Sequence, residues 1–487
     1  MNKITSAKEI SDFIKDLENR FNPQDWKIDD VDIWPVLRVN LHYELSAKLI
    51  KMSGRERSFK QKVTRALGAF SSIFEKKAKP AKILMVSDGI SYTKIDSYLY
   101  ERFCDPIISI LEVKSVTWLK WNLSGNLNGS WKYKAFNIEG ALDLRFIFSK
   151  MDQVKLVNQI PNFKEFIIFI MKETGICWSE DKINKQINQF ISIEKWYLKQ
   201  LKLIKPSLVI IVSYYSDRGM ALIKACRSLN IQTADIQHGV QGEMHMAYSN
   251  WQKVPITGYN TLPNDFIVWS EAESEAIKKW AKNTPHSSMI LGNLFEEGWF
   301  AKEGEIITGI DSTLKSLLET MSASKTVLFT LQYGLEYEEW VFECIRVTQF
   351  EFNWLIRLHP VINDEFHINK LTALMKKYGI TNYELIISSS LPLYGVLRNV
   401  NVHVTHSSTT VVEAKHFGVK SIILSDYGQE FFSQEINERT AYCIHNFTAE
   451  DLRNLCNSTY SERVLNAIDM EENKAEVYTN EYLETYL

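Results

Sequence analysis

Short apolar runs that end in polar residues or glycine recur along the chain, separated by amphipathic stretches. The run AKILMVSDG, residues 81–89, is one of them, and this pattern is typical of a buried parallel strand. Residues 206–239 predict a strand at Ser207–Val212, a helix at Asp217–Ser228 and a strand at Gln232–Gln237. Strand, helix and strand within roughly thirty residues form a βαβ unit, so we expect these strands to be parallel neighbours.

The same alternation continues in the second half of the chain and predicts a further helix at 271–281. The strands expected there are DFIVWS, SMILGN, KTVLFTLQYG and FNWLIRLHP, which begin at residues 265, 288, 325 and 352. A second βαβ unit has strands at Val400–Thr405 and Ser421–Ser425, with a helix at Thr409–Phe417 that stops at Gly418. Repeated units of this kind predict an α/β protein built from doubly wound, Rossmann-like domains.

The length of the chain determines how these units are divided. At 487 residues it exceeds one ordinary hydrophobic core, and we place the joint near residues 255–265. We expect an N-terminal Rossmann-like domain, residues 1–260, with a helical extension at its start. A C-terminal Rossmann-like domain, residues 261–487, would face it across a cleft. The polar helical stretch after Thr448 would pack back across the joint.

Composition and charge exclude several classes of protein. The net charge of −3 argues against a dedicated nucleic-acid binder, so no nucleic-acid partner is expected. The six cysteines include no CxxC pair, so they suit a reducing compartment and supply neither a disulfide framework nor a zinc site. The most apolar run, at residues 163–171, is far shorter than the ~20 residues that span a bilayer. We therefore expect a soluble cytoplasmic protein.

One segment departs from this average composition. Residues 47–82 contain eleven Lys and Arg against two Glu, and apolar side chains recur in it at helical spacing. These side chains are Phe59, Val63, Leu67, Phe70 and Phe74. A basic helix with such a stripe can lie on an anionic membrane surface, which would bring the protein to the inner face of the cytoplasmic membrane. We favour the alternative that the stripe packs on the first domain, because most amphipathic helices are ordinary core helices.

Candidate binding residues gather where the predicted strands end. The loop of residues 213–219, with Tyr214 and Asp217, and the loop that begins at His238 should emerge together at the carboxyl edge of one parallel sheet. Ligands bind at this edge in open α/β sheets. The residues that accompany the histidine are Gln237, Gly239 and Glu243. We expect Gly239 to permit the tight turn that exposes the imidazole.

Two motifs in the second half of the chain suit a phosphate group. RLHP places Arg357 and His359 at the end of a strand, where charged groups are costly unless they meet an anion. In THSSTTVVEA, hydroxyl side chains fill the start of a helix, where free backbone amides attract anions. They include Ser407, Ser408 and Thr409. Glu413 follows one turn later, and either accepts hydrogen bonds from a ribose or is a solvated surface residue.

No motif for a bound cofactor is present in the sequence. The chain has no GxGxxG after a strand, no GxxxxGK[ST] and no GxSxG. No spacing of His, Cys and carboxylate residues indicates a catalytic metal. We therefore expect neither a cofactor nor a metal.

The motifs QHG, LGN, RLHP and HSSTT with its following Glu together resemble those of GT-B glycosyltransferases that build bacterial capsules and lipopolysaccharide. Sialyltransferases, Kdo transferases and CDP-glycerol glycerophosphotransferases of that group share the HP and Ser/Thr motifs. The resemblance implies that His359, Ser407 and Ser408 contact the donor nucleotide and its phosphate. The first-half motif is acidic in the CMP-sugar enzymes and His-Gly in the glycerophosphotransferases, which implies a catalytic base at His238. Further candidates in loops after predicted strands are Asn293 and Gln332.

We therefore expect a glycosyltransferase that takes a sugar from a nucleotide-activated donor, with a CMP-linked ulosonic acid of the Kdo type favoured. The acceptor would be lipid-linked or an oligosaccharide, in capsule or O-antigen synthesis. His238 would take the proton from the acceptor hydroxyl, and the alternative for it is a structural histidine that caps its loop. Three other functions stay open: a CDP-alditol phosphotransferase, a nucleotide-sugar 2-epimerase, and a non-catalytic partner in polysaccharide assembly.

Overall fold

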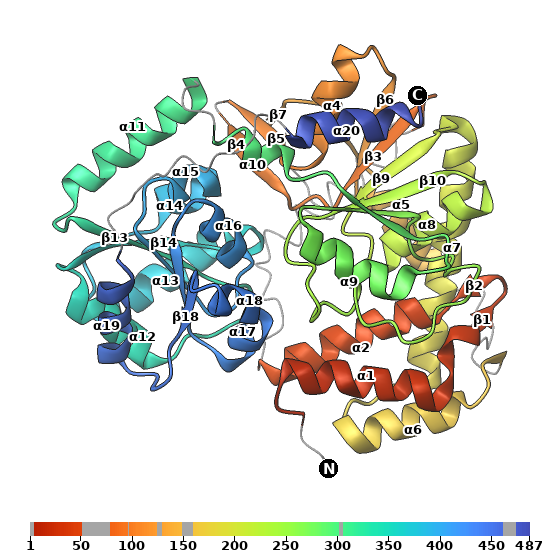
Figure 1. Ribbon diagram of the computed structural model, residues 1–487, viewed down its shortest axis with the longest axis horizontal. Coiled ribbons are helices and arrows are strands. Elements are labelled where there is room, and N and C mark those ends of the chain that lie inside the picture. The colour runs from red at the N-terminus through yellow and green to blue at the C-terminus, as the bar shows by residue number, and fades with distance from the viewer. Residues whose placement is uncertain are drawn as a thin grey trace.

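The computed structural model describes residues 4–50, 78–95, 97–123, 129–148, 159–300, 305–460 and 474–487. Two parallel sheets organise most of these residues, and Figure 1 shows them side by side with helices on their faces. The predicted basic helix, with its stripe at Phe59, Val63, Leu67, Phe70 and Phe74, lies outside the described residues. No helix in the described ranges has the length and apolar character needed to cross a membrane.

The first sheet has seven parallel strands in the order β12-β11-β10-β9-β3-β6-β8. Their bounds are β3 (Ile83–Ser87), β6 (Trp118–Asn122), β8 (Phe136–Asn137), β9 (Leu208–Val212), β10 (Gln232–Ile236), β11 (Asp265–Val268) and β12 (Ser287–Ile290). Every residue of β3 and β9 is buried, as expected for parallel strands that are covered on both faces. The strand order reverses between β3 and β9, so the crevice for ligands lies beyond Ser87 and Val212.

The predicted βαβ unit is confirmed almost residue for residue. β9, α8 (Asp217–Ser228) and β10 follow one another as expected, and Leu208 of β9 lies in register with Gln232 of β10. Ser216 caps α8, since its hydroxyl accepts a hydrogen bond from the backbone N of Gly219 at 3.0 Å. The loop before α8 and the loop after β10 therefore emerge at the same edge of the sheet.

The second sheet has six parallel strands in the order β15-β14-β13-β16-β17-β18. Their bounds are β13 (Lys325–Thr330), β14 (Phe352–Arg357), β15 (Tyr383–Glu384), β16 (Val402–Thr405), β17 (Lys420–Ile423) and β18 (Ala441–Cys443). The order reverses between β13 and β16, where Thr330 lies opposite Thr405. This is a Rossmann-like arrangement, and its ligand crevice lies beyond these two residues.

Two strands that were expected in the second domain belong to the first sheet. β11 pairs in parallel with β10, with Phe266 opposite Asp235, and β12 pairs with β11. The first sheet therefore extends to Ile290, and the division between the sheets falls between Ile290 and Lys325 rather than at residue 260. The apolar pattern of a strand indicates that it is buried, but it does not specify the sheet that the strand joins.

Helices cover both sheets. In the first half they are α1 (Ala7–Phe21), α2 (Trp34–Leu49), α4 (Cys104–Val113), α5 (Glu139–Phe148), α6 (Phe163–Thr174), α7 (Glu180–Ile204), α8, α9 (Glu271–Ala281) and α10 (Leu294–Glu297), with the 3-10 helix η1 (Pro23–Asp25). In the second half they are α11 (Glu305–Thr320), α12 (Glu339–Thr348), α13 (Glu365–Lys377), α14 (Ile386–Ser390), α15 (Leu393–Leu397), α16 (Thr410–His416), α17 (Asp426–Phe431), α18 (Ser433–Asn437) and α19 (Ala449–Thr459), with η3 (Pro360–Ile362). Two small sheets complete the first half: β1 (Lys27–Ile28) with β2 (Val31–Asp32), and β4 (Tyr92–Ile95) with β5 (Tyr98–Glu101) and β7 (Ser130–Trp131).

The N-terminal helices α1 and α2 are tied to the loop after β10 by a buried ion pair. Nε of Arg38 lies 2.8 Å from Oε1 of Glu18, and both side chains are buried. Nη2 of Arg38 donates to O of Ser249 at 3.0 Å, and Oε2 of Glu18 accepts from the backbone N of Gln252 at 2.8 Å. The guanidinium also lies 3.9 Å above the ring of Trp251. The helical extension therefore holds the far end of the loop that starts at His238.

The C-terminal helix α20 (Lys474–Glu484) returns to the first sheet. The stretch after Thr448 was expected to do this as a whole, but its first helix, α19, stays with the second half, where Arg453 pairs with Glu351 at 2.6 Å. Oη of Tyr482 donates to Oδ2 of Asp265 in β11 at 2.9 Å, and Glu484 forms an ion pair at 2.8 Å with Lys114, the residue after α4. Figure 1 shows α20, in dark blue, beside α4. The chain thus crosses between its halves twice, once after β12 and once before α20.

Candidate active site between the two sheets

Loops that follow the strands of the two sheets meet in this structure. A Cβ atom added to Gly239, after β10, would lie 3.3 Å from Cγ2 of Thr409, at the start of α16. Nη1 of Arg102 in the first half lies 3.9 Å from Oε1 of Glu413, one turn into α16. The structure therefore places the His238 loop against the Ser/Thr segment, although the two are far apart in the sequence.

Gly239 is needed for this approach, and not for the tight turn that the sequence predicted. Its φ lies outside the left-handed region, so other residues could adopt its backbone conformation. The size of the side chain at residue 239 is restricted instead, because a Cβ at 3.3 Å from Cγ2 of Thr409 is closer than an ordinary van der Waals contact. Gln237 fixes the loop: its buried Nε2 donates to O of Gly239 at 2.9 Å, and its Oε1 accepts from N of Trp269 at 2.7 Å.

His238 is half-buried between aromatic side chains. Its Nε2 lies 3.0 Å from Oη of Tyr215, and its ring meets the ring of Phe103 edge-on, 6.4 Å away. Burial lowers the pKa of His238 below its ordinary value; the charge of Arg102 adds to this shift and that of Asp88 opposes it. The imidazole is therefore neutral at pH 7 and is able to accept a proton.

Arg102 is a candidate that the sequence analysis missed. It follows β5, its Nε donates to O of Ser91 at 3.4 Å, and its guanidinium lies 5.2 Å above the ring of Phe103. Together with Asn293 it lines a small cavity within the first half, beside Thr479 of α20. The signal in the sequence was the same as for Arg357, a charged residue directly after a strand-like run. Nothing local indicated that this hairpin strand ends beside His238.

Arg357 ends β14, as predicted, and is held by backbone carbonyls. Its Nη1 donates to O of Ser388 and, at 2.7 Å, to O of Leu391. Burial and the nearby charge of Arg102 lower the pKa of Arg357 to about 10, while Glu413 opposes the shift. The guanidinium therefore keeps its charge at neutral pH.

Two guanidinium groups thus act on one carboxyl group where the two halves meet. From here on, the joint means this region around Arg102, Arg357 and Glu413. Burial raises the pKa of Glu413, and the charges of Arg102 and Arg357 oppose that shift. The charge of Glu296 adds to the rise in pKa, and that carboxyl group lies 2.9 Å from Nδ1 of His416. With Glu413 ionised, Arg102, Arg357 and Glu413 together carry one net positive charge. A phosphate fits such a place, because guanidinium binds it with forked, charge-assisted hydrogen bonds. Glu413 is buried, so the alternative of a solvated surface residue is wrong.

The Ser/Thr segment bonds mainly to itself and to Gln332. N and Oγ of Ser407 both donate to Oε1 of Gln332, at 2.9 and 3.1 Å. Oγ of Ser408 donates to Oγ1 of Thr410 at 3.0 Å, and Thr409 occupies the N-cap position without a capping hydrogen bond from its side chain. α16 has only seven residues. Its helix start therefore contributes less to an anion site than the sequence predicted.

His359 and Asn293 each cap a short helix near the joint. Nδ1 of His359 accepts from the backbone N of Val361 at 3.2 Å, at the start of η3. Oδ1 of Asn293 accepts from N of Glu296 at 3.2 Å, and its Nδ2 donates to Oη of Tyr394 at 3.2 Å. These bonds fix the shape of the loops around the two arginines.

Three other predicted candidates have separate structural partners. Tyr214 is buried, and its hydroxyl donates to a backbone carbonyl. Asp217 accepts hydrogen bonds from Nε2 of Gln186 at 3.1 and 3.0 Å. Glu243 is exposed and forms an ion pair with Lys279. These contacts stabilise the loops and helices of the first half.

Comparisons with known proteins bear on the fold. No protein-family model matches the chain, and no curated protein matches its sequence. The structure of UDP-GlcNAc 2-epimerase from Methanocaldococcus jannaschii, in complex with UDP-GlcNAc and UDP, is 12% identical, with a TM-score of 0.50 over 83% of this chain and 99% of that chain. UDP-GlcNAc 2-epimerase from Neisseria meningitidis, bound to UDP-GlcNAc, is 13% identical, with a TM-score of 0.48 over 83% and 98%. A glycotransferase of kitacinnamycin is 10% identical, with a TM-score of 0.45 over 84% and 96%.

The chain has the GT-B fold. Two Rossmann-like parallel sheets, joined between β12 and β13 and again before α20, carry this conclusion together with the M. jannaschii structure. The predicted fold class is therefore confirmed. At these identities the likeness establishes the architecture and leaves the chemistry to the residues at the joint.

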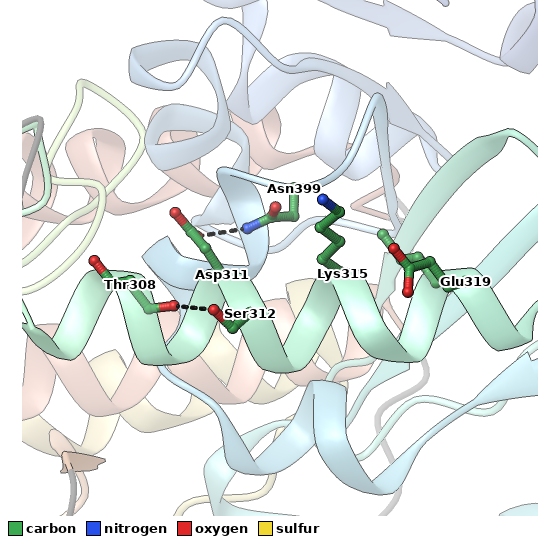
Figure 2. Close-up of a pocket in the computed structure, with 7 residues that line it drawn as sticks. Thr308, Asp311, Ser312, Lys315, Glu319 and Asn399 are labelled. Atoms are coloured by element: carbon green, nitrogen blue, oxygen red, sulfur yellow. Dashed lines mark hydrogen bonds between the residues drawn. The ribbon is translucent and has the colours of Figure 1, made fainter.

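Two larger pockets lie elsewhere in the GT-B architecture. One, of about 530 Å³, runs along α11, where Asp311 accepts a hydrogen bond from Asn399 at 2.8 Å (Figure 2). The other, of about 390 Å³, lies beyond the ends of β13 and β14 and is lined mainly by apolar and tyrosine side chains. Of the predicted site residues, only Gln332 lines either pocket.

The contact between Gly239 and Thr409 gives a test of how the two halves meet. We expect Gly239→Ala to lower the melting temperature, because the added methyl group would press on Cγ2 of Thr409. Overpacking of this kind costs about 1–3 kcal/mol. Thr409→Ser removes the obstructing methyl group, so the double variant should recover most of the loss. Calorimetry of the wild type, both single variants and the double variant measures this, and additive effects would show that the two residues do not touch.

Proposed function

We propose that the chain is a glycosyltransferase that moves a sugar from a nucleotide-activated donor to a hydroxyl group of an acceptor. The observation that carries the proposal is the placement of a neutral histidine, His238, with the guanidinium groups of Arg102 and Arg357 at one joint of the GT-B fold. Displacement of a phosphate by a hydroxyl needs a base for the hydroxyl and positive charge for the phosphate. This joint offers both.

The proposed step is a single displacement. The acceptor oxygen forms a bond to the anomeric carbon, and the bond from that carbon to the donor phosphate breaks. The hydroxyl proton passes to His238, and the electron pair of the broken bond stays on the nucleotide phosphate. Arg102 and Arg357 stabilise the negative charge that develops there. Such a displacement inverts the configuration of the anomeric carbon.

Two considerations bear on the identity of the donor. The RLHP and Ser/Thr motifs resemble those of enzymes that use CMP-linked sugars, which favours a CMP-linked ulosonic acid. Structures of the same fold in complex with UDP-GlcNAc favour a uridine nucleotide. The proposal covers a nucleotide sugar of either class. It includes, on the motif resemblance, a lipid-linked or oligosaccharide acceptor in surface polysaccharide synthesis.

A nucleotide-sugar 2-epimerase is the second candidate. The observation in its favour is that two structures with this activity resemble the chain over 98% and 99% of their own length. Both functions would use the positive joint for a nucleotide sugar, but only a transferase needs a separate acceptor. With the nucleotide sugar alone, an epimerase would produce an isomeric nucleotide sugar. A transferase would release at most a little free nucleotide.

Nucleotide binding tests the positive joint. We expect at least one of CMP, CDP, UDP and GDP to raise the melting temperature. Arg102→Ala and Arg357→Ala should each weaken its affinity by about 1–3 kcal/mol, the range for charge-assisted hydrogen bonds, as measured by isothermal titration. Arg453→Ala is the matched control, because that arginine pairs with Glu351 on the surface at 2.6 Å.

Unchanged affinity in both Arg102→Ala and Arg357→Ala would place the nucleotide elsewhere. If none of the four nucleotides binds, the proposal fails as a whole, and the non-catalytic assembly partner becomes the better interpretation.

The pH dependence of transfer tests His238 as the base. Because burial lowers the pKa of His238, its neutral form persists to lower pH than for a free histidine. The rate should therefore stay level near pH 7 and fall only as the pH drops below the ordinary value of about 6.5. His238→Ala should remove this acidic limb and lower kcat by ~10²–10⁴ with near-normal nucleotide affinity. The exposed His445→Ala is the control, and reduced affinity with an intact kcat in His238→Ala would assign His238 to nucleotide binding.

A further inference from the structure

Neither ring nitrogen of His238 is open to an acceptor hydroxyl in this structure. Nδ1 is buried and has no hydrogen-bond partner of regular geometry within the described part of the chain. Nε2 lies 3.0 Å from Oη of Tyr215. A base must come within hydrogen-bond reach of the proton it takes, directly or through one intervening group. Among the described residues, the hydroxyl of Tyr215 is the side-chain group within hydrogen-bond distance of a His238 ring nitrogen.

Tyr215 lies where an acceptor can approach it. It belongs to the loop after β9, at the reversal of strand order in the first sheet, and it is half-buried. Its ring stacks on the ring of Tyr43 in α2, with the centroids 5.9 Å apart and the planes 26° from parallel. Tyr43 is 42% exposed. His245 packs on Tyr215 at 5.1 Å from another side. The Tyr215 ring therefore connects half-buried His238 to the partly exposed ring of Tyr43 in the helical extension.

The protonation of the two groups sets the direction of their hydrogen bond. Burial raises the pKa of the Tyr215 hydroxyl, so it carries its proton at neutral pH and can donate it. The backbone carbonyl of Ile236 favours a proton on the His238 ring. Since Nε2 faces Tyr215, we assign the proton of the neutral ring to Nδ1. Nε2 then accepts the hydrogen bond from Oη of Tyr215.

We propose that Tyr215 relays the acceptor proton to His238 and is itself the group that touches the acceptor hydroxyl. This inference rests on the proposed transferase function and deepens it. As the acceptor oxygen attacks the anomeric carbon, its proton moves to Oη of Tyr215, and the Tyr215 proton moves to Nε2 of His238. The bond from carbon to phosphate breaks, and its electron pair leaves with the nucleotide. Tyr215 ends unchanged and His238 ends as an imidazolium, which the charge of Asp88 favours.

Chemical modification tests the geometry without any substrate. Diethyl pyrocarbonate attacks an unprotonated ring nitrogen that it can reach, so His238 should react slowly in the wild type. Tyr215→Phe keeps the ring but removes the oxygen on Nε2, and should speed the reaction several-fold, as measured by mass spectrometry of the His238 peptide. Tyr214→Phe is the matched control, because the neighbouring hydroxyl of Tyr214 donates to O of Ala247 instead. Equal rates in the wild type and Tyr215→Phe would overturn the inference.

Turnover of the nucleotide sugar that the nucleotide panel identifies tests the relay itself. Tyr215→Phe should lower kcat by ~10²-fold or more with unchanged nucleotide affinity, and Tyr214→Phe should not. The Tyr215→Phe, His238→Ala double variant should be no slower than His238→Ala, because both side chains act on one proton. A normal kcat in Tyr215→Phe with a lost kcat in His238→Ala would overturn the relay and leave the transferase proposal standing. A normal kcat in His238→Ala would overturn the base and the relay together.

Discussion

The close approach of Gly239 to Thr409 is the constraint on which the rest of the site depends. It brings a loop of one Rossmann-like sheet into van der Waals range of a helix start in the other. Partly buried charges on either side then lie close together, as Arg102 and Glu413 do at 3.9 Å, and their interaction is stronger than it would be in water. This is why Arg102, from the first half, shifts the pKa values of Arg357 and Glu413 in the second. A Cβ atom at 239 would lie 3.3 Å from Cγ2 of Thr409, so that the Thr409 side chain would have to shift by a few tenths of an ångström.

The charges at the joint are the reason that we propose it as a binding site. Holding two half-buried guanidinium groups beside the buried carboxyl group of Glu413 costs free energy, and a partner anion reduces that cost. Side chains around the arginines are already committed to capping and to holding loops, as Asn293 and His359 show. The helical extension also holds a loop near the site: Arg38, which is paired with Glu18, donates to O of Ser249 in the loop that follows His238. Together these contacts fix a neutral histidine and a positive cluster in place before any ligand arrives.

Much of this arrangement could be predicted from the sequence, for identifiable physical reasons. The β9–α8–β10 unit was predicted closely because continuous apolar runs and the Ser216 cap leave local signals. Apolar runs of the same kind predicted the ends of β10 and β14. They therefore placed His238 and Arg357 at the carboxyl edges of the two sheets. The assignment of β11 and β12 failed, because parallel strands of both sheets have the same apolar pattern and sheet membership depends on long-range pairing. Arg102 was missed because the hairpin that carries it meets His238 only in the folded chain.

A crystal structure with a bound nucleotide tests the central claim most directly. Crystals should be soaked with whichever of CMP, CDP, UDP and GDP stabilises the protein in solution. The account predicts nucleotide phosphate within hydrogen-bond distance of Arg102 or Arg357, on the side of the joint that His238 and Tyr215 face. Phosphate bound instead in the pocket beyond β13 and β14, or along α11, would contradict the claim that this joint is the active site.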